Sequence, residues 1–215
     1  MPDPMRAPLP GQCSAHLLDG ASRRFATVMF TDMEDSSGLG EQLDLDTFAA
    51  MIVEQTAIAA NAVHRHGGRI ADFTGDGVLA VWLARDSAPS TTARRGLAAA
   101  AEIAGKMRAA GALSRLQGAP HRRLRVGIHS GEILVQEAGD GLQPFLFGPT
   151  LHRARRLEQA GKRDADRDAV INASCETLSL AGATASPGDR RRGWVGLGSG
   201  TPGPPPTSTY QEVRP

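Results

Sequence analysis

Aromatic residues, cysteine and lysine are all scarce in this chain of 215 residues, which contains one Tyr, two Trp, six Phe and two Cys. Cys13 and Cys175 lie far apart and show no metal-ligand spacing, so we expect free thiols in a reducing compartment. Lys106 and Lys162 are the only lysines, and the remaining positive side chains are arginines. A functional site that requires lysine would therefore have to use Lys106 or Lys162.

Long apolar runs and an excess of one charge are also missing. No stretch approaches the ~18–20 apolar residues of a membrane span, and residues 1–20 lack the apolar run of a signal peptide. The formal net charge of +1 gives no bulk reason to expect nucleic-acid binding. We therefore expect a soluble, cytoplasmic protein that binds neither membranes nor nucleic acid.

The pattern of the chain predicts one domain with two irregular ends. Residues 1–22 are Pro-rich and lack periodicity, which indicates a flexible N-terminal arm. The folded domain is expected over residues 23–197. Residues 198–215 form a Gly- and Pro-rich tail, in which 209–213 could add an edge strand.

Hydrophobic periodicity and turn residues predict an α+β fold. The order of elements indicates a ferredoxin-like centre, in which helices pack on one mostly antiparallel sheet. Two hairpins are expected, one turning at Gly75-Asp76-Gly77 and one at Ser130-Gly131. Strands are predicted at 25–30, 69–73, 78–83, 124–129, 132–136 and 169–172, and helices at 36–66, 91–110, 148–160 and 174–180, the first capped by Ser36 or Ser37.

Two carboxylates stand where predicted strands stop. Asp32 follows the first apolar strand, and Asp76 lies in the turn of the first hairpin. A pair of carboxylates from neighbouring strands is suited to hold hard divalent cations against a triphosphate. Taken alone, Asp32 could be a helix cap and Asp76 an ordinary turn residue.

Four motifs carry a resemblance to a known family. They are residues 30–37 (Phe-Thr-Asp-Met-Glu-Asp-Ser-Ser), 67–80 with Gly75-Asp76-Gly77, 125–132 (Arg-Val-Gly-Ile-His-Ser-Gly-Glu) and 147–158 (Phe-Gly-Pro-Thr-Leu-His-Arg-Ala-Arg-Arg-Leu-Glu). In this order and spacing they resemble the two metal motifs, the central strand pair and the transition-state helix of class III nucleotidyl cyclases. The resemblance covers about residues 25–160.

The resemblance implies a reaction and a set of cofactors. Family members convert a nucleoside triphosphate into a 3′,5′-cyclic nucleotide and pyrophosphate, with two Mg²⁺ or Mn²⁺ ions. Asp32, Asp76 and the backbone carbonyl of Met33 would be the metal ligands. Ser36 and Ser37 would cradle phosphates at a helix N-terminus.

The resemblance also implies a head-to-tail homodimer with shared active sites. Arg156 of one chain would stabilise the transition state at the metal carboxylates of the other. Its neighbours Arg153 and Arg155 are interpreted as a solvated charged face. Phe30 of the first motif is expected to lie beside the nucleotide.

Several positions depart from the family pattern. His152 replaces the transition-state Asn and can still donate a hydrogen bond, although a purely structural role on the helix is the alternative. Asp35 replaces a Gly near the phosphate cradle, where an extra negative charge is expected to weaken triphosphate binding unless it points away or helps to hold metal. The late phosphate-binding Lys falls near Gly198, so its role is vacant or taken by one of the arginines at 190–192.

The base-reading positions differ most from the purine pattern. Adenylate cyclases use Lys and Asp there and guanylate cyclases Glu and Cys, whereas this chain has Asp72 and Phe145. An ionised Asp72 only accepts hydrogen bonds, which guanine N1 and N2, uracil N3 or the cytosine amino group could donate. Phe145 adds bulk that favours a small base. The alternatives are a surface strand residue for Asp72 and core packing for Phe145.

These departures, the size of the chain and the lack of an attached regulatory domain lead to a hypothesis about the substrate. Small stand-alone pyrimidine cyclases of bacterial antiphage signalling make cyclic UMP or cyclic CMP for a downstream receptor protein. We therefore interpret the chain as a pyrimidine cyclase, with UTP as the leading substrate. The alternatives are an adenylate or guanylate cyclase with an atypical base pocket, a degraded homologue that only binds, and a generic metal-dependent phosphotransferase.

Overall fold

The expected βαββαβ centre is present in the computed structural model, which describes residues 20–84, 87–116, 122–136, 144–160, 169–183 and 194–197. This confirms the α+β, ferredoxin-like prediction. Its elements, in chain order, are β1 (Ser22–Met33), α3 (Leu45–Arg65), β2 (Arg69–Phe73), β3 (Val78–Leu83), α4 (Pro89–Leu116) and β4 (Leu124–Gln136).

One sheet of seven strands organises the fold. The strand order is β2-β3-β1-β4-β6-β7, with β6 at Ala169–Ser174, β7 at Trp194–Leu197 and β5 (Phe145–Phe147) paired to β4. Only β4 and β6 run parallel; the other pairs are antiparallel. The long β1–β4 pairing sets Asp32 opposite Arg125, which later decides the geometry of the site.

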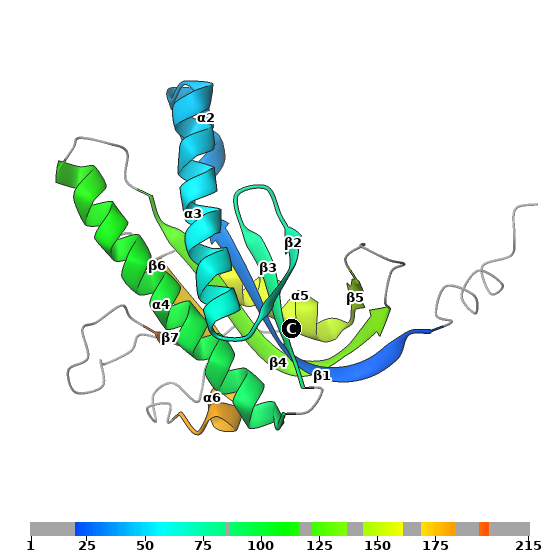
Figure 1. The fold of residues 1–215 in the computed structure, drawn as a ribbon. Coiled ribbons are helices and arrows are strands. Elements are labelled where there is room, and N and C mark those ends of the chain that lie inside the picture. Colours follow the sequence, from blue (N-terminus) through cyan, green and yellow to red (C-terminus); the bar gives the residue numbers. More distant parts are fainter. Residues whose placement is uncertain are drawn as a thin grey trace, which may run out of the picture.

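Helices cover both faces of the sheet. Figure 1 shows α3 and α4 in front of the sheet and α5 (Pro149–Ala160) behind it. The front core joins α3, α4 and α6 (Cys175–Ala181) to the sheet around Trp82 and Met29. The rear core is smaller and joins Ala154 of α5 to Val28, Phe30 and Val81. Among the described helices, none is long and apolar enough to cross a membrane.

The helix expected over 36–66 is two helices. A short α2 (Ser36–Gln42) ends before α3, and Asp44 caps α3 by accepting a hydrogen bond from the Thr47 amide at 2.9 Å. Thus the predicted cap at Ser36 or Ser37 is wrong, because these residues already lie in the first turn of α2. Helix α4 extends beyond the predicted 91–110 at both ends.

The prediction of a second hairpin, at Ser130-Gly131, is wrong. Residues 124–136 form one continuous strand, with Gly131 opposite Ala26 and Ser130 opposite Thr27. Gly131 serves packing rather than a turn, because a Cβ there would lie 2.7 Å from the Thr150 hydroxyl of α5. The first hairpin is confirmed at its predicted bounds, and its turn is closed by the Thr74 amide donating to the Gly77 carbonyl at 3.0 Å.

Several strand bounds differ from the prediction. Strand β1 begins at Ser22 and continues to Met33, β6 runs two residues further than expected, and neither β5 nor β7 was predicted. The arm up to residue 19, the edge strand at 209–213 and the positions Cys13, Lys162 and Gly198 lie outside the described residues.

Candidate functional site

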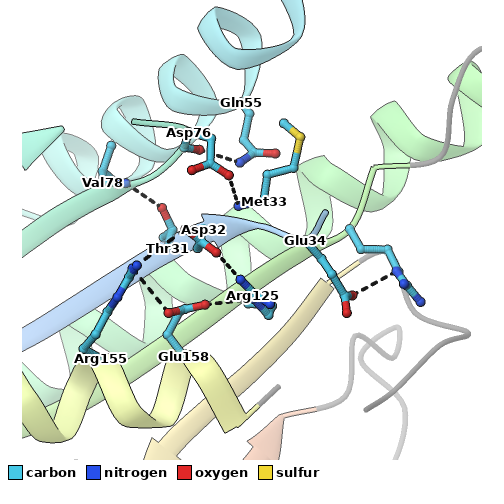
Figure 2. Close-up of polar contacts among 11 residues, drawn as sticks. Thr31, Asp32, Met33, Glu34, Gln55, Asp76, Val78, Arg125, Arg155 and Glu158 are labelled. Carbon is cyan, nitrogen blue, oxygen red and sulfur yellow. Dashed lines mark hydrogen bonds and ion pairs between the residues drawn. The ribbon is translucent and has the colours of Figure 1, made fainter. Parts of the chain in front are cut away.

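The turn that carries Asp76 is attached directly to the end of β1. The Met33 amide donates to Oδ2 of Asp76 at 3.1 Å, and the Val78 amide donates to the Thr31 hydroxyl at 3.0 Å. Figure 2 shows these contacts beside Gln55, whose buried side-chain amide donates to the Asp76 carbonyl at 2.9 Å. The turn of the first hairpin therefore places Asp76 at the end of β1, which carries Asp32 and Met33.

Glycine is required at two positions of this turn. A Cβ at Gly77 would collide with the backbone carbonyl of Thr31, so only glycine lets the hairpin approach β1 this closely. Gly75 has a φ of 75°, in the left-handed region that side chains disfavour. Gly77 is therefore needed for close packing and Gly75 for the backbone conformation. Together they fix the position of Asp76 in the turn.

Asp32 belongs to a buried group of charges, which we call the acid–arginine cluster and which comprises Asp32, Arg125, Arg155 and Glu158. Oδ2 of Asp32 accepts a hydrogen bond from Nη2 of Arg125, and Oδ1 lies 3.8 Å from Nη1 of Arg155. Glu158 lies 2.8 Å from Nε of Arg125 and 3.3 Å from Nη1 of Arg155. Figure 2 shows the two arginines between the two carboxylates.

The backbone explains why these four residues meet. Asp32 and Arg125 are cross-strand partners on β1 and β4. Glu158 and Arg155 come from α5, which lies against β4 at Gly127, where a Cβ would collide with the backbone of Ala154 and Glu158. Helix and strand backbones therefore touch, and the helix delivers its charged side chains to the end of β1.

Burial shifts the protonation equilibria in the cluster. Burial, reinforced by the charge of Asp32, raises the pKa of Glu158 to about 7, although Arg125 and Arg155 oppose the shift. Burial acts to lower the pKa of Arg125, but the hydrogen bond to Asp32 and the charge of Glu158 outweigh it and raise that pKa. Arg125 therefore remains a permanent cation beside Asp32.

Arg155 is a functional candidate that the sequence interpretation missed. It was expected on a solvated face, yet it faces Asp32 and Glu158, and its guanidinium carbon lies 5.5 Å from the centre of the Phe30 ring. This distance fits a cation–π contact. The pattern of three arginines could not single out Arg155, because the choice depends on how α5 is rotated against β4.

The two predicted transition-state residues lie on a different part of α5. His152 and Arg156 are both exposed, and a spacing of four residues places them on one side of the helix. Arg155 is one residue, or about 100°, away from Arg156 around the helix axis. The helix therefore carries one set of charged groups toward Asp32 of its own chain and another set outward.

The donors fit a hard divalent cation. Within the residues that the structure describes, no group of three or more His, Cys, Asp or Glu side chains could hold a metal. A metal site would therefore rest on Asp32, Asp76 and the Met33 carbonyl, completed by substrate phosphates, which is a usual arrangement for Mg²⁺. Asp32 keeps Oδ1 for such an ion, because Arg125 is hydrogen-bonded to Oδ2.

The predicted phosphate cradle is occupied by an unusual backbone turn. Asp35 is the N-cap of α2 with a φ of 57°, and its side chain makes no capping hydrogen bond. A Cβ at Gly38 would lie 2.8 Å from either Asp35 oxygen, so this carboxylate lies over the first turn that holds Ser36 and Ser37. The negative charge of Asp35 therefore stands close to the place expected for phosphate.

Both predicted base-reading residues are exposed. Asp72 follows a bulge in β2, and its Oδ1 accepts a hydrogen bond from the Phe73 amide at 2.8 Å. Phe145 is 59% exposed and stacks on Phe147, with 6.3 Å between ring centres. Packing of Phe145 in the core of its own chain, one of the alternatives considered, is excluded by this exposure.

Comparison with known proteins points in one direction. No protein-family model matches the chain. Over 144 residues it is 33% identical to Adenylate cyclase 1 of Rhizobium meliloti (strain 1021), a match that covers 66% of this chain and 22% of that protein. The chain thus spans about a fifth of the length of this relative.

Solved structures share the fold. The adenylyl cyclase CyaB from P. aeruginosa superposes with a TM-score of 0.65 and 24% identity, covering 74% of this chain and 81% of that one. The guanylyl cyclase Cya2 superposes with a TM-score of 0.63 and 23% identity, covering 85% and 96%. The resemblance carried by the four motifs is confirmed: the chain has the fold of a class III nucleotidyl cyclase catalytic domain.

Proposed function

We propose that the chain is a nucleotidyl cyclase that converts a nucleoside triphosphate into a 3′,5′-cyclic nucleotide and pyrophosphate. The main support is the attachment of the Asp76 turn to the end of β1, which brings Asp76 beside Met33 and Asp32. Two carboxylates and a backbone carbonyl at one strand end suit two-metal phosphoryl chemistry. The relative named as an adenylate cyclase adds to this support.

The residues have distinct roles in the proposed reaction. Asp32, Asp76 and the Met33 carbonyl hold two Mg²⁺ or Mn²⁺ ions, which supply charge that activates the 3′-hydroxyl and neutralises the phosphates. Arg156 stabilises the charge on the α-phosphate in the transition state, and His152 donates a hydrogen bond to ribose or phosphate.

Three further residues line the proposed nucleotide site. Ser36 and Ser37 stay predicted phosphate contacts in the first turn of α2. Phe30, which contacts Arg155, stays a predicted neighbour of the nucleotide.

We also propose that two copies assemble head to tail. Arg156 and His152 are both exposed on α5, which suits a role in a second chain. Phe73, Phe145 and Phe147 are exposed, and large exposed apolar side chains often mark contact surfaces. Phe145 is one of the proposed base-reading residues, and Phe73 follows the other, Asp72. The contact between the two chains would therefore also complete the base pocket.

Complementation between inactive variants tests the shared site. Asp76→Ala and Arg156→Ala should each abolish cyclic nucleotide production, whereas an equal mixture should recover about a quarter of the wild-type rate, because half of the random dimers contain one intact site. A mixture of Asp76→Ala with Asp32→Ala is the matched control and should stay inactive, since both changes affect the same half-site. Absence of rescue in the first mixture contradicts the shared-site proposal.

For the base, we propose a pyrimidine, with UTP ahead of CTP. Asp72 offers only acceptors when ionised, which suits the N3–H of uracil or the amino group of cytosine, and Phe145 offers a bulky ring for stacking. The product would act in the cytoplasm on a cyclic-nucleotide receptor in antiphage signalling. The named relative supports adenylate cyclase as the second candidate.

An assay with Mn²⁺ and each of ATP, GTP, UTP and CTP separates these candidates. Turnover of UTP or CTP, lost in Asp72→Ala, supports the pyrimidine proposal. Turnover of ATP alone overturns it in favour of adenylate cyclase. No product from any nucleotide, together with nucleotide binding, identifies a degraded homologue and overturns the cyclase proposal. The catalytic domain is proposed to span residues 23–197.

A further inference from the structure

Arg155 is held less firmly than its partner arginine in the acid–arginine cluster. The Arg125 side chain is 9% exposed, hydrogen-bonds Asp32 and lies 2.8 Å from Glu158. The Arg155 side chain is 37% exposed and lies 3.8 Å and 3.3 Å from the two carboxylates. Nη1 of Arg155 and Nε of Arg125 are both buried without a hydrogen-bond partner among the described residues, so the two arginines differ in exposure and in their contact with Asp32. Arg155 is thus the arginine that can leave the cluster.

Its position matters because of the oxygen that it faces. Oδ2 of Asp32 is engaged by Arg125, which leaves Oδ1 as the oxygen available to a metal ion. Nη1 of Arg155 lies 3.8 Å from that oxygen. A divalent ion bound at Oδ1 would sit at about 2.0–2.2 Å from it, so the ion and the guanidinium would be separated by only a few ångströms. Two cations cannot share that space without strong repulsion.

The surroundings of Arg155 allow it to move aside. The side chain starts from α5, whose backbone is fixed against β4 at Gly127, so the helix need not shift. The guanidinium is partly open to solvent and contacts the face of Phe30, which offers a weak, non-directional hold. A departure of Arg155 would leave Arg125 in contact with both Asp32 and Glu158, and the charge of the incoming divalent ion would replace that of Arg155 beside Asp32.

We infer that Arg155 is a displaceable counter-ion of Asp32: it neutralises this carboxylate in the metal-free chain and competes with a divalent cation for Oδ1. Arg155 therefore lowers the metal affinity of the chain and sets the cation concentration at which the site fills. The inference rests on the proposed function, because it takes Asp32 as a metal ligand.

Mn²⁺ binding to the full chain without nucleotide tests the inference, with the electron paramagnetic resonance signal of free Mn²⁺ as the readout. Arg155→Met removes the charge but keeps an apolar stem over Phe30. We expect it to lower the Kd for Mn²⁺ about fivefold, the change that corresponds to ~1 kcal/mol. Arg155→Lys keeps a cation and should stay within about twofold of wild type. Arg153→Met is the control, since this exposed arginine of the same helix pairs with Glu176 and should leave the Kd unchanged.

The outcomes distinguish the inference from the function on which it rests. If Arg155 only supports the fold, Arg155→Met will bind Mn²⁺ as tightly as wild type or more weakly, and either result overturns the inference. Undetectable Mn²⁺ binding in both wild type and Arg155→Met overturns it as well. Asp32→Asn, alone and combined with Arg155→Met, should abolish binding. If Asp32→Asn abolishes binding while Arg155→Met gains none, the metal site stands and the inference fails. Binding that survives Asp32→Asn rejects the proposed metal site itself.

Discussion

Removing Arg125 would strand two buried carboxylates, which makes Arg125→Met a strong test of the cluster. Arg125 is buried and contacts both Asp32 and Glu158. Methionine fills a similar volume but supplies no charge and no hydrogen-bond donor. In the variant, Arg155 alone would remain to balance the two carboxylates, at 3.8 Å and 3.3 Å.

The expected cost follows from burial of the charges. Loss of one partner from a buried ion pair typically costs about 3–5 kcal/mol, because the other charge stays desolvated without compensation. For a domain of this size, a loss of that magnitude lowers Tm by on the order of 10 °C. Arg153→Met removes an exposed pair at 3.6 Å from Glu176 and should cost about 0–1 kcal/mol.

Urea unfolding at neutral pH, followed by circular dichroism, measures both variants against wild type. A second variant, Arg125→Met with Asp32→Asn, removes the carboxylate that loses its hydrogen bond to Arg125 and should regain about 0.5–3 kcal/mol relative to Arg125→Met alone. Glu158 is less suited to this test, because loss of Arg125 raises its pKa further and the group takes up a proton at neutral pH. The reasoning fails if Arg125→Met costs no more than Arg153→Met. It also fails if the double variant is no more stable than the single one, because the penalty would then not come from unbalanced charge.

Three further predictions concern single contacts. The pKa of Glu158 is raised from 4.5 to about 7, so its contribution to the stability of wild type falls as pH rises from about 4.5 through about 7. Glu158→Gln lacks this loss, and its unfolding free energy relative to wild type should increase by about 2–3 kcal/mol between about pH 5 and about pH 8 in urea titrations. Gly127→Ala should push α5 off β4 and cost about 1–3 kcal/mol in urea unfolding. Gly105→Ala, whose Cβ meets nothing within 4 Å, should be neutral or stabilising, and equal behaviour of the two variants would contradict this account. Ser174→Ala removes the N-cap of α6 and the 2.7 Å hydrogen bond between the Ser174 hydroxyl and Nδ1 of His129. The change should cost about 1–2 kcal/mol by thermal unfolding, and an unchanged Tm would refute this prediction.

Local sequence patterns predicted the part of the site that depends on local geometry. Gly75-Asp76-Gly77 between two apolar runs is a turn pattern, and the hairpin has its predicted bounds. Ser130-Gly131 looks equally like a turn, yet β1 pairs along the whole of β4 and Gly131 makes room for Thr150 instead. A long partner strand overrode the local preference, and no pattern within 124–136 could reveal it.

The acid–arginine cluster depends on contacts between distant parts of the chain, which explains why the sequence interpretation missed it. Asp32 and Arg125 are 93 residues apart and meet only through the register of β1 and β4. The choice among Arg153, Arg155 and Arg156 depends on the rotation of α5, which the contact at Gly127 decides. The motifs predicted the fold without revealing which arginine faces which carboxylate.

Helix α5 carries two sets of charged or polar side chains with different proposed roles. Arg155 and Glu158 reach Asp32 of their own chain, while His152 and Arg156, on the outward side, are proposed to act in the second chain. In a head-to-tail dimer, each helix α5 would therefore contribute to two active sites, one through Arg155 and the other through Arg156. A change in how α5 packs against β4 would then affect both active sites of the dimer together.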